Sequence, residues 1–339
     1  MSPIFRRMMF AMALAAFIVI PAVAATPVTW KVVTDLRTSR QFTEKWKFFA
    51  EEMKKRTNGE VVVEVFSLPE LNLNGQELVR MLNSNLLDVA EVITGYVSGE
   101  VPILEGVQLV GTFRDYEHNH EGYKAFMPIV QDKYSKIIGG IPVGTFAFAT
   151  MQIWSRFPMN TLADLKGKKI RVFSVSQADY INALGGEAVF IPLSDIYVSL
   201  ERGLVDGCIT GPAAGAGMKL WEVTKHVIDL RLGAGAGFIV ISRKSYAALS
   251  EKNKAVFDQL AKEIDKIGWS IGKKDNDEGL EQAAAHGMTV LHSAKPEWQE
   301  RLQEVARTVV VPSWIKRAGP DAKDLFNKVF APIVGFDVK

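Results

Sequence analysis

Cysteine is nearly absent from this sequence of 339 residues. The single Cys208 cannot form an internal disulfide, and there is no cysteine cluster to bind zinc. An excess of one charge is missing as well. Residues 1–25 hold two of the 40 bases, Arg6 and Arg7, and no acid, so 38 bases face 38 acids in the rest of the chain. Nucleic-acid-binding domains are strongly basic or carry a basic stripe, and we therefore expect no nucleic-acid partner.

Long apolar runs are also missing after residue 25. Before it, the paired arginines are followed by a 13-residue apolar run, residues 8–20, and by the small residues Ala22-Val23-Ala24. This order is typical of a cleaved signal peptide, and the run is shorter than the roughly 20 residues that span a bilayer. An uncleaved membrane anchor is the alternative. We expect an exported protein in the periplasm, with residues 1–25 removed.

Catalytic and cofactor motifs are missing too. The sequence has no Gly-x-Ser-x-Gly elbow, no Walker loop and no His-Glu-x-x-His. His118 and His120 are two residues apart, so on a helix they face different sides and are not expected to bind a metal ion. The glycine-rich run 233–237 precedes a strand-like segment and not a helix, which indicates a flexible crossing between domains and not a dinucleotide loop. We expect no metal, no cofactor and no enzymatic activity.

The pattern that is present is an alternation of strands and helices, which is typical of an α/β protein. Apolar residues at steps of three and four predict a helix over 42–53 and one long helix over 250–286. At 1.5 Å per residue the long helix would measure roughly 50 Å, so it must serve both of the two domains that the chain length suggests. Strands are predicted at 30–33, 61–66, 88–93, 141–150, 169–173 and 188–191.

Arg171 stands out because it lies between Ile170 and Val172 in a predicted strand. A guanidinium in a half-buried strand needs a partner of opposite charge. That partner is either an internal carboxylate or the carboxylate of a ligand, which the planar guanidinium can hold through two hydrogen bonds. The spacing alone leaves both alternatives open.

The sequence resembles the solute-binding proteins of tripartite ATP-independent periplasmic (TRAP) transporters, of the dicarboxylate-binding-protein type. The order and spacing of a few segments carry this resemblance, namely 162–172, 185–186, 194–200, 203–207 and 221–225. It implies a two-lobed α/β fold, like that of periplasmic binding proteins, with a long helix that braces both lobes. It also implies a membrane permease partner with a small and a large subunit. The expected boundaries are 26–148 plus 236–276 for the first lobe and 149–235 plus 277–339 for the second.

In this family the arginine of the Lys-Gly-x-Lys-x-Arg strand holds the ligand carboxylate, and Arg171 falls on that position. Met151 and Thr210 stand where the sialic-acid binders of the family carry polar groups. We therefore expect a hydrophobic or aromatic monocarboxylate as the ligand. The other expected pocket residues are Trp154, Phe173 and Phe190 from the second lobe, with Arg37, Gln41 and Glu91 from the first. An exported enzyme or a sensory ligand-binding module on the same scaffold is the alternative function.

Overall fold

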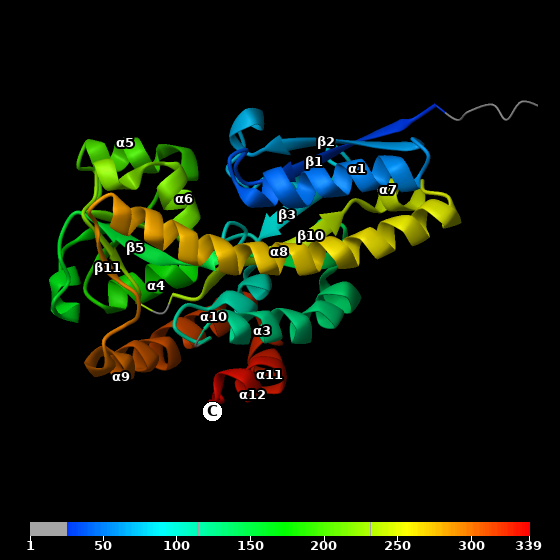
Figure 1. The fold of residues 1–339 in the computed structure, drawn as a ribbon. Helices are drawn as coiled ribbons and strands as arrows, with labels where there is room; N and C mark the ends of the chain where they lie inside the picture. Colours follow the sequence, from blue (N-terminus) through cyan, green and yellow to red (C-terminus); the bar gives the residue numbers. More distant parts are fainter. Residues whose placement is uncertain (1–25, 114, 231) are drawn as a thin grey trace, which may run out of the picture.

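The computed structural model describes residues 26–113, 115–230 and 232–339 (Figure 1). The predicted signal peptide, residues 1–25, lies outside the described residues. None of the described helices is both long and apolar enough to cross a bilayer. Two sheets form two lobes, and one helix runs along both of them (Figure 1).

The first lobe is built on a five-stranded sheet in the order β2-β1-β3-β10-β4. β1 pairs in parallel with β2 and β3, while β10 is antiparallel to both β3 and β4. The strands are β1 Val28–Thr34, β2 Val61–Ser67, β3 Val89–Ile93, β4 Ile141–Thr150 and β10 Ala234–Ile241. Strand β10 comes from late in the sequence and lies in the interior of the sheet, so the chain returns to the first lobe after building the second.

The second lobe is built on a six-stranded sheet in the order β11-β9-β5-β8-β6-β7. β6 pairs in parallel with β7 and β8, and β5 is antiparallel to β8 and β9. The strands are β5 Gln152–Ser155, β6 Lys169–Val172, β7 Glu187–Phe190, β8 Gly207–Thr210, β9 His226–Ile228 and β11 Thr289–Leu291. β4 and β5 are separated by Met151 alone, so this residue lies at a crossing between the lobes.

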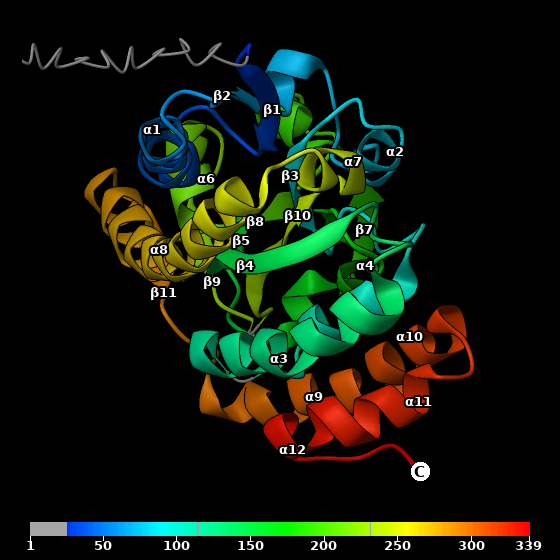
Figure 2. The same cartoon turned by 90° about the vertical axis from the view of Figure 1, so that its right-hand side faces the viewer.

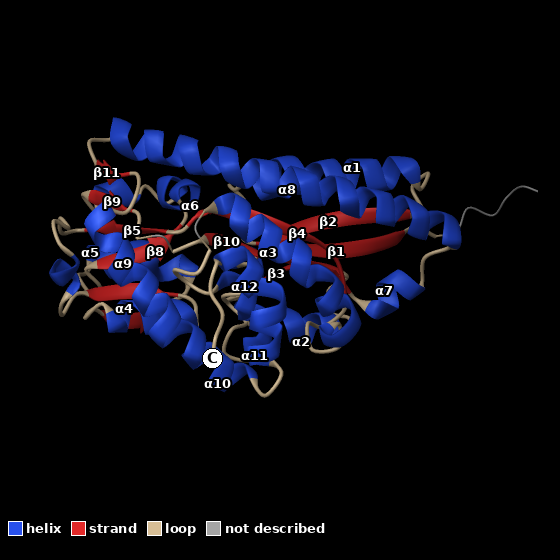
Figure 3. Ribbon diagram, turned by 90° about the horizontal axis from the view of Figure 1, so that it is seen from below, coloured by secondary structure: helices blue, strands red, loops and turns tan. Residues whose placement is uncertain are grey.

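Helices cover the sheets of both lobes (Figure 3). The predicted helix over 42–53 is present as a π-helical turn, Gln41–Trp46, that continues into α1. The helices before the long one are α1 Lys47–Arg56, α2 Leu78–Asn83, α3 Tyr116–Ile129, α4 Val175–Ala183, α5 Ile196–Glu201, α6 Pro212–Gly217 and α7 Arg243–Ala247. Those after it are α9 Pro296–Val305, α10 Val311–Ala318, α11 Ala322–Leu325 and α12 Ala331–Val334.

The long helix is confirmed as one uninterrupted element, α8 Glu251–Ala285, of 35 residues. The Ser250 hydroxyl accepts a hydrogen bond from the Asn253 amide and caps its first turn. Its first half buries Leu260 and Ile264 in the core of the first lobe. Its last turns bury Leu280 and Ala283 in the core of the second. The helix therefore joins two cores, as its length predicted.

Glycines inside α8 lie where other backbone comes close. A Cβ on Gly272 would lie 2.4 Å from the Phe148 carbonyl oxygen, and one on Gly279 would lie 2.4 Å from the carbonyl carbon of Pro212. Glycine lowers helix propensity by about 1 kcal/mol relative to alanine. Here the missing side chain lets α8 pack directly on β4 and α6.

One expectation about a crossing needs correction. The run 233–237 was expected to be a flexible crossing, but β10 begins at Ala234 and is buried throughout. A Cβ on Gly237 would lie 2.2 Å from the Val92 carbonyl oxygen, so this glycine serves close strand packing. Only Gly233, with φ of +81°, keeps the conformation of a turn.

The C-terminal segment joins both lobes, whereas residues 277–339 were assigned to the second lobe alone. The Trp314 indole on α10 donates to the Pro102 carbonyl at 2.7 Å, and its ring packs over Gly106. Phe330 packs against Phe126 of α3. Figure 2 shows α3 beside these C-terminal helices. The apolar faces of short helices are buried here against the first-lobe chain.

Candidate functional site

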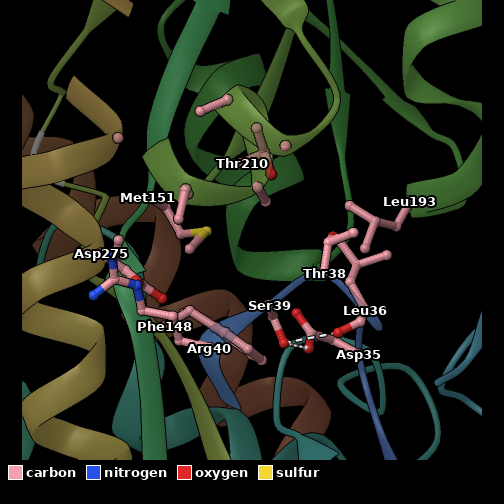
Figure 4. A pocket seen from close by; sticks show the side chains of 18 of the residues that line it. Asp35, Leu36, Thr38, Ser39, Arg40, Phe148, Met151, Leu193, Thr210 and Asp275 are labelled. Carbon is pink, nitrogen blue, oxygen red and sulfur yellow. Dashed lines mark hydrogen bonds and ion pairs between the residues drawn. The ribbon is translucent and has the colours of Figure 1, made fainter. Parts of the chain in front are cut away.

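A cavity of about 240 Å³ lies between the two lobes, beside α8. Its walls come from the turn after β1, the ends of β3, β4, β6 and β8, and one face of α6 and α8. In Figure 4, Asp35, Ser39 and Arg40 lie along one edge and Thr210 along the opposite edge. Both lobes therefore contribute residues to this site.

Arg171 reaches this cavity from β6. Its side chain is 1% exposed, and its Nε and Nη1 each donate a hydrogen bond at 2.8 Å, to the carbonyl oxygens of Ile191 and Ile209. The guanidinium lies 5.2 Å from the ring centre of Phe173. Within the part of the chain that the structure describes, no carboxylate oxygen lies within 4.0 Å of it. Burial lowers the pKa of Arg171, and Tyr96 beside it opposes this shift.

Tyr96 lies in the cavity wall, near Arg171 of the second lobe and Asp35 of the first. Burial raises the pKa of its hydroxyl, Arg171 lowers it and Asp35 raises it. The ring packs edge-on against Phe173, with the ring centres 5.3 Å apart. A Cβ on Gly95 would lie 2.6 Å from the Phe173 ring, so a glycine is needed for this contact between the lobes.

Asp35 lines the cavity from the first lobe, directly after β1, and is 7% exposed. Its Oδ1 accepts a hydrogen bond from the Ser39 hydroxyl at 2.9 Å (Figure 4). No basic group of the described residues lies within 4.0 Å of the carboxylate. Burial, and then the nearby Glu91, raise the pKa of Asp35 to about 7.

Arg40 is a second cation in the cavity wall, and the sequence analysis missed it. Its Nε lies 3.2 Å from the Asp275 carboxylate on α8, and Nη2 pairs with Glu278. Burial raises the pKa of Asp275 to about 6, although Arg40 opposes this shift. The two ion pairs of Arg40 link the first lobe to the second half of α8. Nothing in the local sequence distinguishes it from the neighbouring Arg37.

Three of the residues expected from the second lobe line the cavity together with Arg171. These are Met151, Phe173 and Thr210, of which Met151 and Thr210 are 5% and 4% exposed. Further apolar wall comes from residues that the sequence analysis did not single out, namely Ile93, Phe148 and Leu193. The cavity wall thus combines apolar and charged side chains.

Two other second-lobe expectations were wrong. Trp154 is fully buried in the core of the second lobe, next to Ile196 and Leu200, and does not line the cavity. A Cβ on Gly215 would lie 2.3 Å from its indole, which shows how closely α6 covers it. Phe190 is 57% exposed at the end of the edge strand β7 and does not line the cavity.

The three residues expected from the first lobe also lie elsewhere. Arg37 is exposed and pairs with Glu70. Gln41 is buried, and its Nε2 donates to the Ala147 carbonyl at 2.7 Å and the Gly268 carbonyl at 3.0 Å, which ties the first helical turn to β4 and α8. Glu91 is buried behind the wall, where it pairs with the buried Lys45 and accepts from the Thr34 hydroxyl. The side chains of these three residues interact with other groups of the protein and do not line the cavity.

His118 and His120 do not form a metal-binding cluster with other side chains of the described residues. His118 contacts Asp115, whereas His120 stacks on Trp269 with the ring centres 4.0 Å apart. No group of three or more histidine, cysteine, aspartate or glutamate side chains with a suitable arrangement occurs among the residues described. Cys208 is buried, and burial raises the pKa of its thiol to about 12.

Comparison with known proteins agrees with this architecture. The family model of bacterial extracellular solute-binding proteins, family 7, matches residues 33–312. The C4-dicarboxylate-binding periplasmic protein DctP of Rhodobacter capsulatus is 25% identical over 265 residues, which are 77% of this chain and 79% of that protein.

Two solved structures are similar over most of the chain. A Bordetella pertussis extracytoplasmic solute receptor that binds pyroglutamic acid has a TM-score of 0.82 at 21% identity, covering 91% of this chain and 100% of that one. A marine metagenome TRAP solute-binding protein specific for aromatic acid ligands has a TM-score of 0.79 at 20% identity, covering 91% and 98%. They show the two-lobed fold, and the family match confirms the resemblance drawn from residues 162–225. The chain belongs to the bacterial extracellular solute-binding proteins of family 7.

Proposed function

We propose that this protein is the periplasmic receptor of a TRAP transporter and captures a small organic acid between its two lobes. The acid is a monocarboxylate with an apolar or aromatic body. One observation carries the proposal: the guanidinium of Arg171 is buried in the cavity wall with no carboxylate of the described residues within 4.0 Å. A buried charge is costly unless it is paired, and a ligand carboxylate provides the missing partner.

The surroundings of Arg171 favour this role over a structural one. Two main-chain carbonyls fix the guanidinium from the second lobe, so its direction does not depend on the ligand. A guanidinium has five N–H donors, and those left over match the two oxygens of a carboxylate. The site is thus preorganised for an anion.

The apolar residues of the cavity wall favour a ligand with an apolar body. Phe148, Met151 and Phe173 face the space, and a cavity of about 240 Å³ suits a molecule the size of a small aromatic or branched acid. A hydroxyl group of a uronic or sialic acid costs about 1 to 3 kcal/mol wherever it faces this apolar part of the wall without a partner. Among the receptors similar to this chain, two bind pyroglutamic acid or aromatic acids and two have bound β-D-galacturonate or D-glucuronate, so the preference for an apolar acid rests on the cavity wall.

Delivery to a membrane permease with a small and a large subunit follows from membership of the TRAP type. The two walls of the cavity belong to different lobes, so a ligand that contacts both favours their closed arrangement. In this proposal the permease recognises the closed form. The protein performs no covalent chemistry on the acid.

A thermal-shift panel on the mature chain tests the proposal. Phenylacetate and 4-methyl-2-oxopentanoate should raise the melting temperature more than D-glucuronate and N-acetylneuraminate, because a ligand that binds only the folded state stabilises it. The same shifts should vanish in the Arg171→Ala protein. A panel in which no carboxylate shifts the wild type, or in which the variant keeps the shifts, would contradict the proposal.

A further inference from the structure

Three acidic residues line the cavity that Arg171 reaches. They are Asp35, Asp275 and Glu278, and the cavity wall holds one further base, Arg40. Arg40 already pairs with both Asp275 and Glu278, so these two carboxylates have a cation. Asp35 differs from them, because no base of the described residues lies within 4.0 Å of it.

Asp35 is also fixed in direction. It follows β1 immediately, and Oδ1 accepts from the Ser39 hydroxyl at 2.9 Å. It is 7% exposed and faces the cavity (Figure 4). The one buried base close behind it, Lys45, pairs with Glu91. A hydroxyl partner leaves the carboxylate with unused acceptor capacity, since two carboxylate oxygens offer about four lone-pair sites.

The cavity therefore has two buried charged groups of opposite sign that lack charged partners, Arg171 on the second lobe and Asp35 on the first. Tyr96 lies near both of them, because the two groups shift the pKa of its hydroxyl in opposite directions. A ligand with a carboxylate at one end and a hydrogen-bond donor at the other satisfies both groups at once. A dicarboxylate instead brings a second negative charge into a cavity that Asp35, Asp275 and Glu278 line.

We propose that the bound acid carries an ammonium group or a neutral N–H donor at the end remote from its carboxylate, and that Asp35 accepts that donor. This inference rests on the proposed function, because it assumes that Arg171 holds the carboxylate. It narrows the ligand to amino or amide-bearing monocarboxylates and excludes dicarboxylates. Asp35 is then the residue of the first lobe that determines specificity.

Three flexible acids of equal chain length test this assignment. Hexanoate, 5-aminopentanoate and adipate differ only in the remote group, which is a methyl, an ammonium or a second carboxylate. By calorimetry at pH 8, 5-aminopentanoate should bind the wild type at least tenfold more tightly than either of the others. A charged donor in a buried site adds binding energy, and like charges repel.

The Asp35→Asn variant keeps the shape and the acceptor for Ser39 but removes the charge. It should lose most of the preference for 5-aminopentanoate over hexanoate, while Asp324→Asn on the exposed surface of α11 should keep it. Equal or tighter binding of hexanoate or adipate by the wild type would overturn the inference. So would failure of all three acids to bind while phenylacetate still binds in an Arg171-dependent manner, a result that leaves the proposed function intact. Loss of every carboxylate response would instead contradict the proposed function itself.

Discussion

Arg171 and Asp35 line the same cavity from opposite lobes, and neither has a partner of opposite charge within 4.0 Å among the described residues. Each is held in place by neutral groups, main-chain carbonyls for Arg171 and the Ser39 hydroxyl for Asp35. The protein thus presents two buried charges whose natural partner is a ligand that spans the lobes. Such a ligand stabilises the closed arrangement through contacts that an open form lacks.

The first prediction concerns the identity of the cation. Arg171→Ala should weaken binding of the cognate acid by about 2 to 5 kcal/mol, because it leaves the ligand carboxylate without its buried partner. Arg171→Lys should recover only part of this loss, since an ammonium keeps the charge but not the planar pair of donors. Calorimetry provides both values. Full recovery by lysine would show that charge alone, without two-point geometry, explains the site.

A second prediction concerns the pH dependence of stability. The pKa of Asp35 rises from 3.8 to about 7 on folding, so the folded chain binds the extra proton between these values. The stabilisation from this group is complete below about pH 4 and is lost as the pH rises to about 7, up to about 4 kcal/mol. Glu91, Lys45 and Tyr96 are the titratable groups that face Asp35.

Urea unfolding at several pH values checks this sign. The Asp35→Asn variant should gain stability relative to the wild type as the pH rises from 4 to 8, because it has no proton to lose. Asp324→Asn should run parallel to the wild type over the same range. A difference between Asp35→Asn and the wild type that does not change with pH would contradict the raised pKa.

The third prediction concerns the ion pair behind the cavity wall. Lys45 and Glu91 are both fully buried, and the Lys45 ammonium also lies 4.7 Å from the ring centre of Phe146. Burial lowers the pKa of Lys45, while Glu91 opposes the shift. Lys45→Met should cost about 3 to 5 kcal/mol of unfolding free energy, because it leaves an uncompensated buried carboxylate.

Two further variants serve as the comparisons for this measurement. Lys55→Met removes a 76% exposed lysine paired with Glu52 and should cost less than about 1 kcal/mol. Adding Glu91→Gln to Lys45→Met should recover part of the loss, since the unpaired charge is gone. A single variant as stable as the wild type in denaturant unfolding would show that the pair does not stabilise the fold.

The fourth prediction concerns the long helix. Gly272→Ala adds about 1 kcal/mol of helix propensity, but the new methyl group would lie 2.3 Å from the Tyr116 hydroxyl and 2.4 Å from the Phe148 carbonyl oxygen. The backbone contact should dominate, with a net loss of about 1 to 3 kcal/mol in denaturant unfolding. Gly99→Ala, which meets no atom within 4 Å, is the control and should be close to neutral. A more stable Gly272→Ala protein would mean that α8 can move away from β4.

Much of the fold was predictable because it depends on local patterns. The 3.6-residue periodicity gave α8 to within one residue at each end, and β4 was predicted with the bounds that the structure has. Arg171 was found because a charged residue interrupts an apolar strand. Met151 followed from its spacing to Arg171, and Thr210 from its place shortly after the segment 203–207, both of which the family resemblance aligned.

The rest of the site depends on contacts between distant segments. Trp154 and Phe173 are both aromatic residues in or next to strands, yet the packing of α6 buries one and leaves the other at the cavity. On the first lobe, Arg37 and Arg40 are three residues apart, and only Arg40 meets α8. Asp35 escaped notice because a lone aspartate after a strand is common in turns.

The most direct test of the central claim compares an acid with its primary amide, for example phenylacetate with phenylacetamide, on wild-type protein and on Arg171→Ala. The two ligands have the same shape and differ in charge. If Arg171 holds the carboxylate, the wild type should bind the acid at least a hundredfold more tightly than the amide. The variant should bind both with similar, weak affinity. Equal binding of acid and amide by the wild type, or a preference for the acid that survives in the variant, would contradict the claim that Arg171 holds the ligand carboxylate.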